Sequence, residues 1–372
     1  DERRTRIEAN AMDMDIEDLI PVENVLVMTS QTGYIKRISL DTYEAQNRGG
    51  VGLIGMETKE EDYVVDMFVT CSHDYVMYFT NKGRAYWLKA YKIPVGGRHA
   101  KGKPIVNLLE HLEDGEKVMS KIPVKQFEGD MYLVFSTRKG LIKKTRLAAY
   151  SHVRQSGIIA IRLEDGDEVV DTALTDGTKE VVLATTKGFA ARFSETDVRA
   201  TGRATYGVRG IRLRKGDEVV SMAIVDPKDL LLSVTERGYG KRSLVGDYRK
   251  IKRGGKGVIT IKTVERNGDV VDVMPVNEDD EIIVTSVKGM VIRMPVKGIS
   301  LLGRATMGVR LMKLKDKDRV VAVARLVPQA EEERMVESGM VVTHVPLQNG
   351  ENGSGQEGGP EGDDEGPGEE EE

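Results

Sequence analysis

The chain has 372 residues, 40% of them hydrophobic and 31% charged, and a formal net charge of −5 at pH 7. This composition allows a folded core, while the single cysteine, Cys71, excludes an internal disulfide framework and a zinc site built on a cysteine pair. The first ten residues are charged where a signal peptide needs an apolar core, and no window approaches the roughly 18 apolar residues of a membrane span. We therefore expect a soluble protein of a reducing cytoplasm, without membrane contact.

The charge is sorted along the chain. Residues 1–24 hold eight acids and three arginines, and residues 349–372 hold ten carboxylates and no lysine or arginine. Residues 25–327 carry 51 Lys and Arg against 38 Asp and Glu, so the body is basic although the whole chain is acidic. This distribution favours an anionic partner for the body, and scattered solubilising charge is the alternative.

A polar turn that ends in glycine occurs six times in the body. Each turn follows a β-rich run such as VLVMTS (25–30) and precedes a second run such as YIKRI (34–38), which predicts a β-hairpin. The turn glycines, spaced by 50, 57, 48, 50 and 51 residues, are Gly33, Gly83, Gly140, Gly188, Gly238 and Gly289.

A second marker follows each hairpin after a long glycine-containing loop. It reads GDEVV at 166–170 and 216–220, with looser forms elsewhere, and it introduces another strand. Each repeat then makes about four short strands, and units of this size are blades of a radial assembly whose neighbours bury each other's faces. We predict an all-β, propeller-like, six-bladed β-pinwheel of four-stranded blades over residues 25–327. Either a closed ring or a shallow spiral fits, with almost no helix.

Basic residues recur at two places in the repeat, which predicts a periodic cationic track on one edge of the assembly. Those that come three to six residues after a turn glycine are Lys36, Arg37, Lys89, Lys143, Lys144, Arg192, Lys241, Arg242 and Arg293. Those in and beside the long glycine-containing loops are Arg48, Arg98, Lys101, Lys103, Arg154, Arg203, Arg209, Lys252, Arg253, Lys256, Arg304 and Arg310.

Double-stranded DNA matches such a track. A duplex presents one negative charge per roughly 1.7 Å of its axis, and bases that neutralise phosphates release counterions. With one Trp in the chain, Trp87, stacking on single-stranded bases is not indicated. Bending a duplex costs on the order of 1–6 kcal/mol, which many distributed contacts would offset, so we expect non-specific phosphate contacts on a bent duplex.

These residues resemble the C-terminal domain of the DNA gyrase A subunit, a bacterial type IIA topoisomerase. The resemblance covers essentially the whole chain. Its most specific stretches are RRTRI (3–7), GKPIVNLL (102–109), GVRGIRL (207–213), GYGKR (238–242) and KGVITIKTVERNG (256–268).

The family's seven-residue box, Gln-Arg-Arg-Gly-Gly-Lys-Gly, corresponds here to QNRGGVG at 46–52. Asn47 and Val51 replace two of its three cations. The resemblance implies that the box holds the end of a DNA wrap, so we expect a weaker grip here, and RGGKG at 253–257 is a candidate to strengthen the track. The box residues that match are Gln46, Arg48, Gly49, Gly50 and Gly52.

The resemblance also implies chiral wrapping of DNA, which presents a segment for strand passage so that gyrase introduces negative supercoils. Its implied partners are double-stranded DNA, the ATPase subunit of the enzyme, and the N-terminal region of the same polypeptide, in the nucleoid of a bacterial cytoplasm. Since the DNA-cleaving tyrosine and the ATPase site lie elsewhere in that enzyme, we expect a monomeric fragment with no catalysis of its own, no cofactor and no metal.

The expected organisation has three parts: a connector at 1–24, the pinwheel at 25–327 and an acidic disordered tail at 328–372. The tail is a candidate competitor for the basic edge, or a solubilising segment. Two other functions stay open. One is the C-terminal domain of topoisomerase IV, and the other is a propeller-type platform for docking acidic proteins. Six intact repeats and the recognisable box favour gyrase.

Overall fold

The computed structural model describes residues 16–30, 33–39, 64–97, 100–109, 111–152, 156–288, 290–315 and 317–326. Within these ranges the chain forms 23 β-strands and seven 3₁₀ helices of three or four residues, and no α-helix. The prediction of an almost helix-free β chain is confirmed. Accordingly, no helix among the described residues has the length and apolarity to cross a membrane.

Every repeat contributes one β-hairpin. The first hairpin strands are β1 (Asn24–Ser30), β4 (Tyr75–Thr80), β8 (Tyr132–Thr137), β12 (Glu180–Thr185), β16 (Leu230–Thr235) and β20 (Glu281–Ser286). The second hairpin strands are β2 (Tyr34–Ser39), β5 (Arg84–Lys89), β9 (Leu141–Arg146), β13 (Phe189–Ser194), β17 (Tyr239–Leu244) and β21 (Val291–Pro295).

Two further kinds of strand complete the sheets. The strands after the second sequence marker are β3 (Val64–Cys71), β7 (Val118–Val124), β11 (Val169–Thr175), β15 (Val219–Val225), β19 (Val270–Val276) and β23 (Val320–Leu326). The two-residue strands in the long loops are β6 (Lys103–Pro104), β10 (Ile158–Ile159), β14 (Val208–Arg209), β18 (Val258–Ile259) and β22 (Val309–Arg310). The 3₁₀ helices are η1 (Ile16–Leu19), η2 (Ala90–Lys92), η3 (Ile105–Asn107), η4 (Leu147–Tyr150), η5 (Glu195–Asp197), η6 (Val245–Asp247) and η7 (Val296–Gly298).

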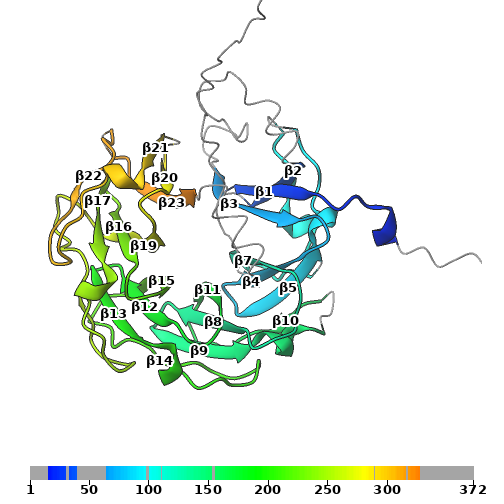
Figure 1. Ribbon diagram of the computed structural model, residues 1–372, viewed down its shortest axis with the longest axis horizontal. Coiled ribbons are helices and arrows are strands. Elements are labelled where there is room, and N and C mark those ends of the chain that lie inside the picture. Colours follow the sequence, from blue (N-terminus) through cyan, green and yellow to red (C-terminus); the bar gives the residue numbers. More distant parts are fainter. Residues whose placement is uncertain are drawn as a thin grey trace, which may run out of the picture.

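The sheets are six antiparallel blades arranged in a ring (Figure 1). The strand after the second marker is the innermost strand of each blade, as in the order β11-β8-β9-β14 of the third blade. The innermost strands of the last and first blades, β23 and β3, lie in contact. Five blades have four strands as predicted, and the sixth has three within the described residues.

The outermost strand of a blade comes from the next sequence repeat. For example, β14 of the fourth repeat pairs with β9 of the third blade, and β18 of the fifth repeat pairs with β13 of the fourth blade. A sequence repeat makes about four strands as predicted, but it is not one blade, which differs from the expectation that the repeat unit is the blade. The exchange places the long glycine-containing loops at the perimeter of the ring (Figure 1).

The hydrophobic core is divided among the contacts between blades. Five clusters each join two consecutive blades, and the cluster of the second and third blades includes Phe79 and Phe135, whose rings pack edge to face with centroids 5.3 Å apart. Because both faces of a blade are covered, the hairpin strands are buried almost throughout. The blades hold each other in a fixed arrangement around the ring.

Strands start at Asn24 and end at Leu326 among the described residues, close to the predicted limits of the pinwheel. The division into connector, pinwheel and tail stays a prediction, and residues 328–372 lie outside the described residues. Within the predicted connector, Glu17 and Glu23 form ion pairs with Lys89 and Arg37. Residues 16–24 are thereby tied to the first two blades.

Candidate nucleic-acid interface

Three lysines that the sequence predicts at an exposed edge are buried inside the blades. Lys36, Lys143 and Lys241 stand three residues after the turn glycines of the first, third and fifth blades, and they are 0%, 2% and 0% exposed. Burial lowers the pKa of Lys143 to about 7 and the pKa of both other lysines to about 8. A phosphate cannot reach ammonium groups at this depth, so the expected exposed position is wrong for them.

These lysines organise the loops at the perimeter instead. Lys36 Nζ donates hydrogen bonds to the carbonyl oxygens of Gly97 and Ala100, both at 3.0 Å, in the loop of the next repeat. The corresponding acceptors are the carbonyl oxygens of Ala160 and Arg203 for Lys143, and of Gly303 and Arg304 for Lys241. Each lysine fixes carbonyl groups of such a loop on its inner side.

Four of the cations that stand four residues after a turn glycine join their blade to the next one. Arg192 Nη1 donates to the carbonyl oxygens of Val245 and Tyr248 at 2.8 and 2.9 Å, and its Nε donates to Glu180 Oε2 at 2.5 Å. The charged groups of this set are used within the protein, so an exposed position is wrong for these side chains too. The other members and their carbonyl acceptors are Arg37 with Ile93, Lys144 with Glu195, and Arg242 with Ile299.

The two remaining hairpin bases of the prediction, Lys89 and Arg293, form ion pairs. Lys89 Nζ lies 2.7 Å from Glu17 Oε1, and the Lys89 side chain is 16% exposed. Arg293 pairs with Glu281, yet its side chain remains 41% exposed. Arg293 is therefore the hairpin base of the described set that stays most accessible to a ligand.

The bases of the long loops do lie at the surface. They flank the two-residue strands at the perimeter of the ring, where β10, β14 and β22 are labelled in Figure 1. Arg203 and Arg304 are half-buried. The exposed ones are Lys101, Lys103, Arg209, Lys252, Arg253, Lys256 and Arg310. The structure thus brings together at the perimeter the loop set of the sequence prediction, but not the hairpin set.

Seven predicted site residues lie outside the described residues. They are Gln46, Arg48, Gly49, Gly50 and Gly52 of the box, and Arg98 and Arg154. Their proposed contacts stay predictions.

The loop at 253–257 is tied to its neighbours along the perimeter. Gly254 N donates to Gly210 O at 2.6 Å, and Arg212 N donates to Gly255 O at 2.8 Å. Backbone hydrogen bonds therefore connect the loops of consecutive repeats. Arg253 Nε donates to Asp197 O at 2.9 Å while its residue stays exposed. The loop therefore presents its cations from a fixed backbone.

Glycine is required where the loop of the fifth repeat passes over the fourth blade, which it completes. Gly257 has φ +70°, and a Cβ there would lie 2.6 Å from the carbonyl oxygen of Ala190 in β13. L-residues rarely adopt this conformation, and the backbone oxygen leaves no room for a side chain. This glycine lets β18 reach the edge of the fourth blade.

A further set of perimeter cations recurs five residues after the glycine that precedes four of the five two-residue strands. Its members are Arg162, Arg212, Lys262 and Lys313. All four are exposed, and none takes part in an ion pair between described residues. Sequence reasoning missed this set, although the stretches IRL, IKT and MKL at a constant offset from glycine carry its signal.

The innermost strands of the third and fifth blades each carry a carboxylate at the same position. Asp171, Ser221 and Asp272 occupy the same position on β11, β15 and β19, next to the irregularity in pairing with the hairpin. Burial, followed by the charge of Asp171, raises the pKa of Asp272 to about 7. No group of three potential metal-ligating side chains forms within the part of the chain that the structure describes.

Comparison with known proteins assigns this arrangement to a family. The model of the DNA gyrase C-terminal domain, a β-propeller, matches six consecutive segments: 24–71, 74–125, 132–176, 179–226, 229–277 and 280–326. The chain belongs to the DNA gyrase C-terminal domain family. Each matched segment begins at or beside a first hairpin strand and ends at or beside an innermost strand, so the family repeat is the sequence repeat and not the blade.

Relatives of this gyrase family are similar over most of the chain. The DNA gyrase A subunit of Clostridium acetobutylicum is 49% identical over 326 residues, which are 88% of this chain and 39% of the relative. The DNA gyrase A subunit of Salmonella typhimurium is 42% identical over 335 residues, which are 90% of this chain and 38% of the relative. The chain thus spans about two fifths of the length of these curated relatives.

Two solved structures share the fold. The C-terminal domain of DNA topoisomerase IV superposes with a TM-score of 0.71 at 28% identity, and covers 86% of this chain and 98% of that chain. The DNA gyrase A C-terminal domain superposes with a TM-score of 0.67 at 30% identity, and covers 82% of this chain and 100% of that chain. The ring of blades is therefore common to both kinds of topoisomerase domain.

Proposed function

We propose that this gyrase-family domain binds duplex DNA without sequence preference and bends it around the perimeter of the ring. The wrap has a fixed handedness and delivers a DNA segment for strand passage, so that the complete gyrase introduces negative supercoils. In that enzyme the domain works with the N-terminal region of its own polypeptide and with the ATPase subunit. The domain itself supplies binding and bending, and no catalytic group.

One observation carries this proposal, namely the exposed base at a single structural position in four consecutive repeats. Arg162, Arg212, Lys262 and Lys313 stand beside successive perimeter strands, and none is neutralised by a carboxylate within the described residues. Bases repeated at the interval of one blade suit a polyanion whose own charges repeat along its length. Contacts to phosphate position a duplex without reading its sequence.

The fixed backbone of the loops supports bending. The buried lysines and the loop-to-loop hydrogen bonds set the positions of the perimeter cations before DNA arrives. The cost of bending a duplex, on the order of 1–6 kcal/mol, has to be offset by contacts that need little reordering. A rigid ring with distributed cations supplies such contacts.

A topoisomerase IV domain is the second candidate, because the solved structure of that domain superposes well on this chain. It predicts DNA binding with a weaker change of DNA topology. A docking platform for acidic proteins predicts weak DNA binding and no change of topology. The 49% identity with a gyrase A subunit over 88% of the chain favours the gyrase function.

Removing the repeated perimeter cations tests the proposal. A variant with R162Q, R212Q, K262Q and K313Q should lower the slope of log K for a duplex against log salt by about 3 to 4, at roughly 0.9 per lost phosphate contact. The control variant K125Q with K228Q changes two exposed lysines that follow innermost strands, and it should keep the wild-type slope. Equal slopes for all three proteins would refute the perimeter as the DNA-binding surface.

A further inference from the structure

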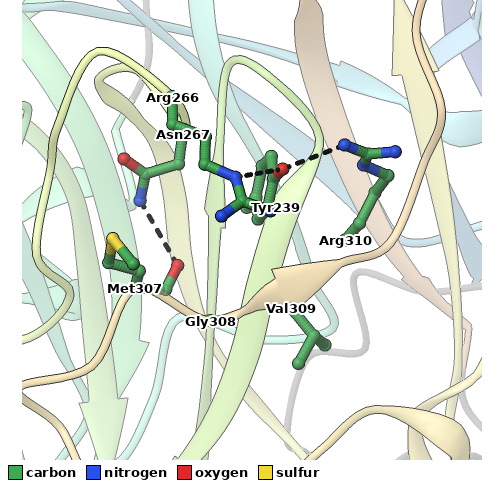
Figure 2. Close-up of a pocket in the computed structure, with 7 residues that line it drawn as sticks. All are labelled: Tyr239, Arg266, Asn267, Met307, Gly308, Val309 and Arg310. Atoms are coloured by element: carbon green, nitrogen blue, oxygen red, sulfur yellow. Dashed lines mark hydrogen bonds between the residues drawn. The ribbon is translucent and has the colours of Figure 1, made fainter.

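A small pocket at the edge of the fifth blade is lined by two arginines that form no ion pair within the described residues. It has a volume of about 410 Å³ and lies between the start of β17, the loop before β19 and the strand β22 (Figure 2). Tyr239 of β17 pairs with Arg310 of β22, so the pocket forms where the exchanged strand joins the blade. Its lining is Tyr239, Arg266, Asn267, Met307, Gly308, Val309 and Arg310.

Two guanidinium groups converge on one hydroxyl in this pocket. Arg266 Nε donates to Tyr239 Oη at 2.9 Å, and Arg310 Nη2 donates to the same oxygen at 3.1 Å (Figure 2). Both guanidinium carbons also lie over the ring, 5.4 and 5.6 Å from its centroid. Since the hydroxyl oxygen accepts both bonds, its own proton is left to donate outward.

Neither guanidinium group is paired with a carboxylate in an ion pair within the described residues. No ion pair there includes Arg266 or Arg310, whereas the nearby Lys187 pairs with Asp269 at 2.7 Å. The hydrogen bonds from Arg310 and Arg266 lower the pKa of the Tyr239 hydroxyl. Like charges held this close favour an anion between them, because an anion relieves their repulsion.

The walls of the pocket are fixed. Asn267 is 1% exposed, and its side-chain amide donates to the carbonyl oxygens of Lys262 at 2.8 Å and Met307 at 3.3 Å. The loop that carries Arg266 is thereby joined to the segment that leads into Arg310. The two arginines are held in place before any ligand binds, which favours tight binding.

The other described blades lack this combination. In the fourth blade Phe189 replaces Tyr239 and Ile259 replaces Arg310, and Arg214 lies over the Phe189 ring at 3.3 Å. In the third blade Leu141 faces Arg209 without an aromatic hydroxyl. The pocket is therefore a specific feature of the fifth blade and not a consequence of the repeat.

We propose that this pocket binds one phosphate group of the DNA backbone and anchors the wrap at the fifth blade. A phosphate accepts several hydrogen bonds at once from guanidinium groups, and the Tyr239 hydroxyl adds a third donor. The proposal rests on the proposed DNA-binding function. Unlike the perimeter bases, which stand one blade apart, the two arginines share one phosphate.

Because the two arginines share one phosphate, their removal should change the salt dependence of DNA binding in a distinctive way. The double variant R266Q/R310Q of the full chain should lower the slope of log K against log salt by about 0.9, the value for one phosphate. The matched double variant K262Q/K313Q, which removes two charges from separate positions, should lower it by about 1.8. Tyr239→Phe should weaken duplex binding about fivefold without changing the slope, because it removes a donor but no charge.

A second measurement on the unmodified chain keeps the test independent of folding defects. The side-chain Nε–H signal of Arg266, assigned by its absence from the R266Q variant, should shift when a short duplex is added and, more weakly, when inorganic phosphate is added. An unshifted Arg266 signal at saturating duplex would refute phosphate binding in the pocket. A decrease of 0 or about 1.8 in the slope of log K against log salt for R266Q/R310Q would refute it too. If the unmodified chain binds no duplex, the proposed function itself fails.

Discussion

At the scale of single residues, lysines have two different roles in this domain. Those inside the blades hold the loops in place, and those in the perimeter loops are exposed to a ligand. Lys143 is buried against loop carbonyl groups, while Lys256 in a perimeter loop is exposed. Sequence alone does not separate these roles, because most acceptors of the buried lysines, such as Arg203 O for Lys143, come from the next repeat and are brought near only by the fold. Sequence reasoning therefore predicts all the hairpin bases at the surface, whereas the structure leaves only Arg293 of this set exposed.

Lys143 should make stability rise with pH. Its pKa is about 7 in the native state and near its usual 10.5 when unfolded, so the unfolded state binds more protons between these values. The free energy of unfolding of the wild type, measured with urea, should rise from about pH 7 to about pH 9 by on the order of 1 kcal/mol more than that of Lys143→Met. Parallel pH profiles for the two proteins would contradict this.

Asp272 should act in the opposite direction in a more acidic range. Its native pKa of about 7 exceeds its usual 3.8, so the native state binds more protons between these values and stability falls as pH rises through about 7. Asp272→Asn stays neutral, so its free energy of unfolding should exceed that of the wild type by on the order of 1 kcal/mol more at about pH 8 than at about pH 5. The comparison needs urea denaturation at both pH values, and a constant difference would contradict the expectation.

At the scale of elements, the hairpins were predictable and the exchanged strands were not. A polar turn ending in glycine between β-rich runs is a local signal, and all six hairpins form where it occurs. A strand of two residues such as Val258–Ile259 has no periodicity, and its partner is 70 residues distant in the sequence at Phe189. The assignment of the outer strand to the neighbouring blade therefore came from the structure alone.

The exchanged strands should depend on their preceding glycines. Gly257→Ala forces a side chain into a positive-φ conformation 2.6 Å from a carbonyl oxygen, and it should destabilise the domain by about 2 kcal/mol or more. Gly202→Ala in another perimeter loop is the control, because no atom lies within 4 Å of its Cβ position, and it should change stability by less than about 0.5 kcal/mol. Thermal unfolding of both variants checks this, and equal midpoints would contradict it.

At the scale of the whole molecule, the perimeter of the ring is basic and residues 349–372 are acidic. Residues 349–372 carry ten carboxylates, and we infer that they compete with DNA for the perimeter cations. Deleting them should raise duplex affinity severalfold at low salt and little at high salt, because screening weakens the competition. A fluorescence-anisotropy titration at two salt concentrations measures this, and unchanged affinity at low salt would leave the segment a solubilising role.

We propose that the fixed handedness of the wrap around the ring is right-handed. The most direct test incubates the 372-residue chain with nicked circular DNA, seals the nick, removes the protein and reads the linking-number change at increasing protein concentration. A right-handed wrap predicts a progressive positive shift in linking number, which the R162Q/R212Q/K262Q/K313Q variant should largely lose. Tight binding with no shift in linking number would contradict it.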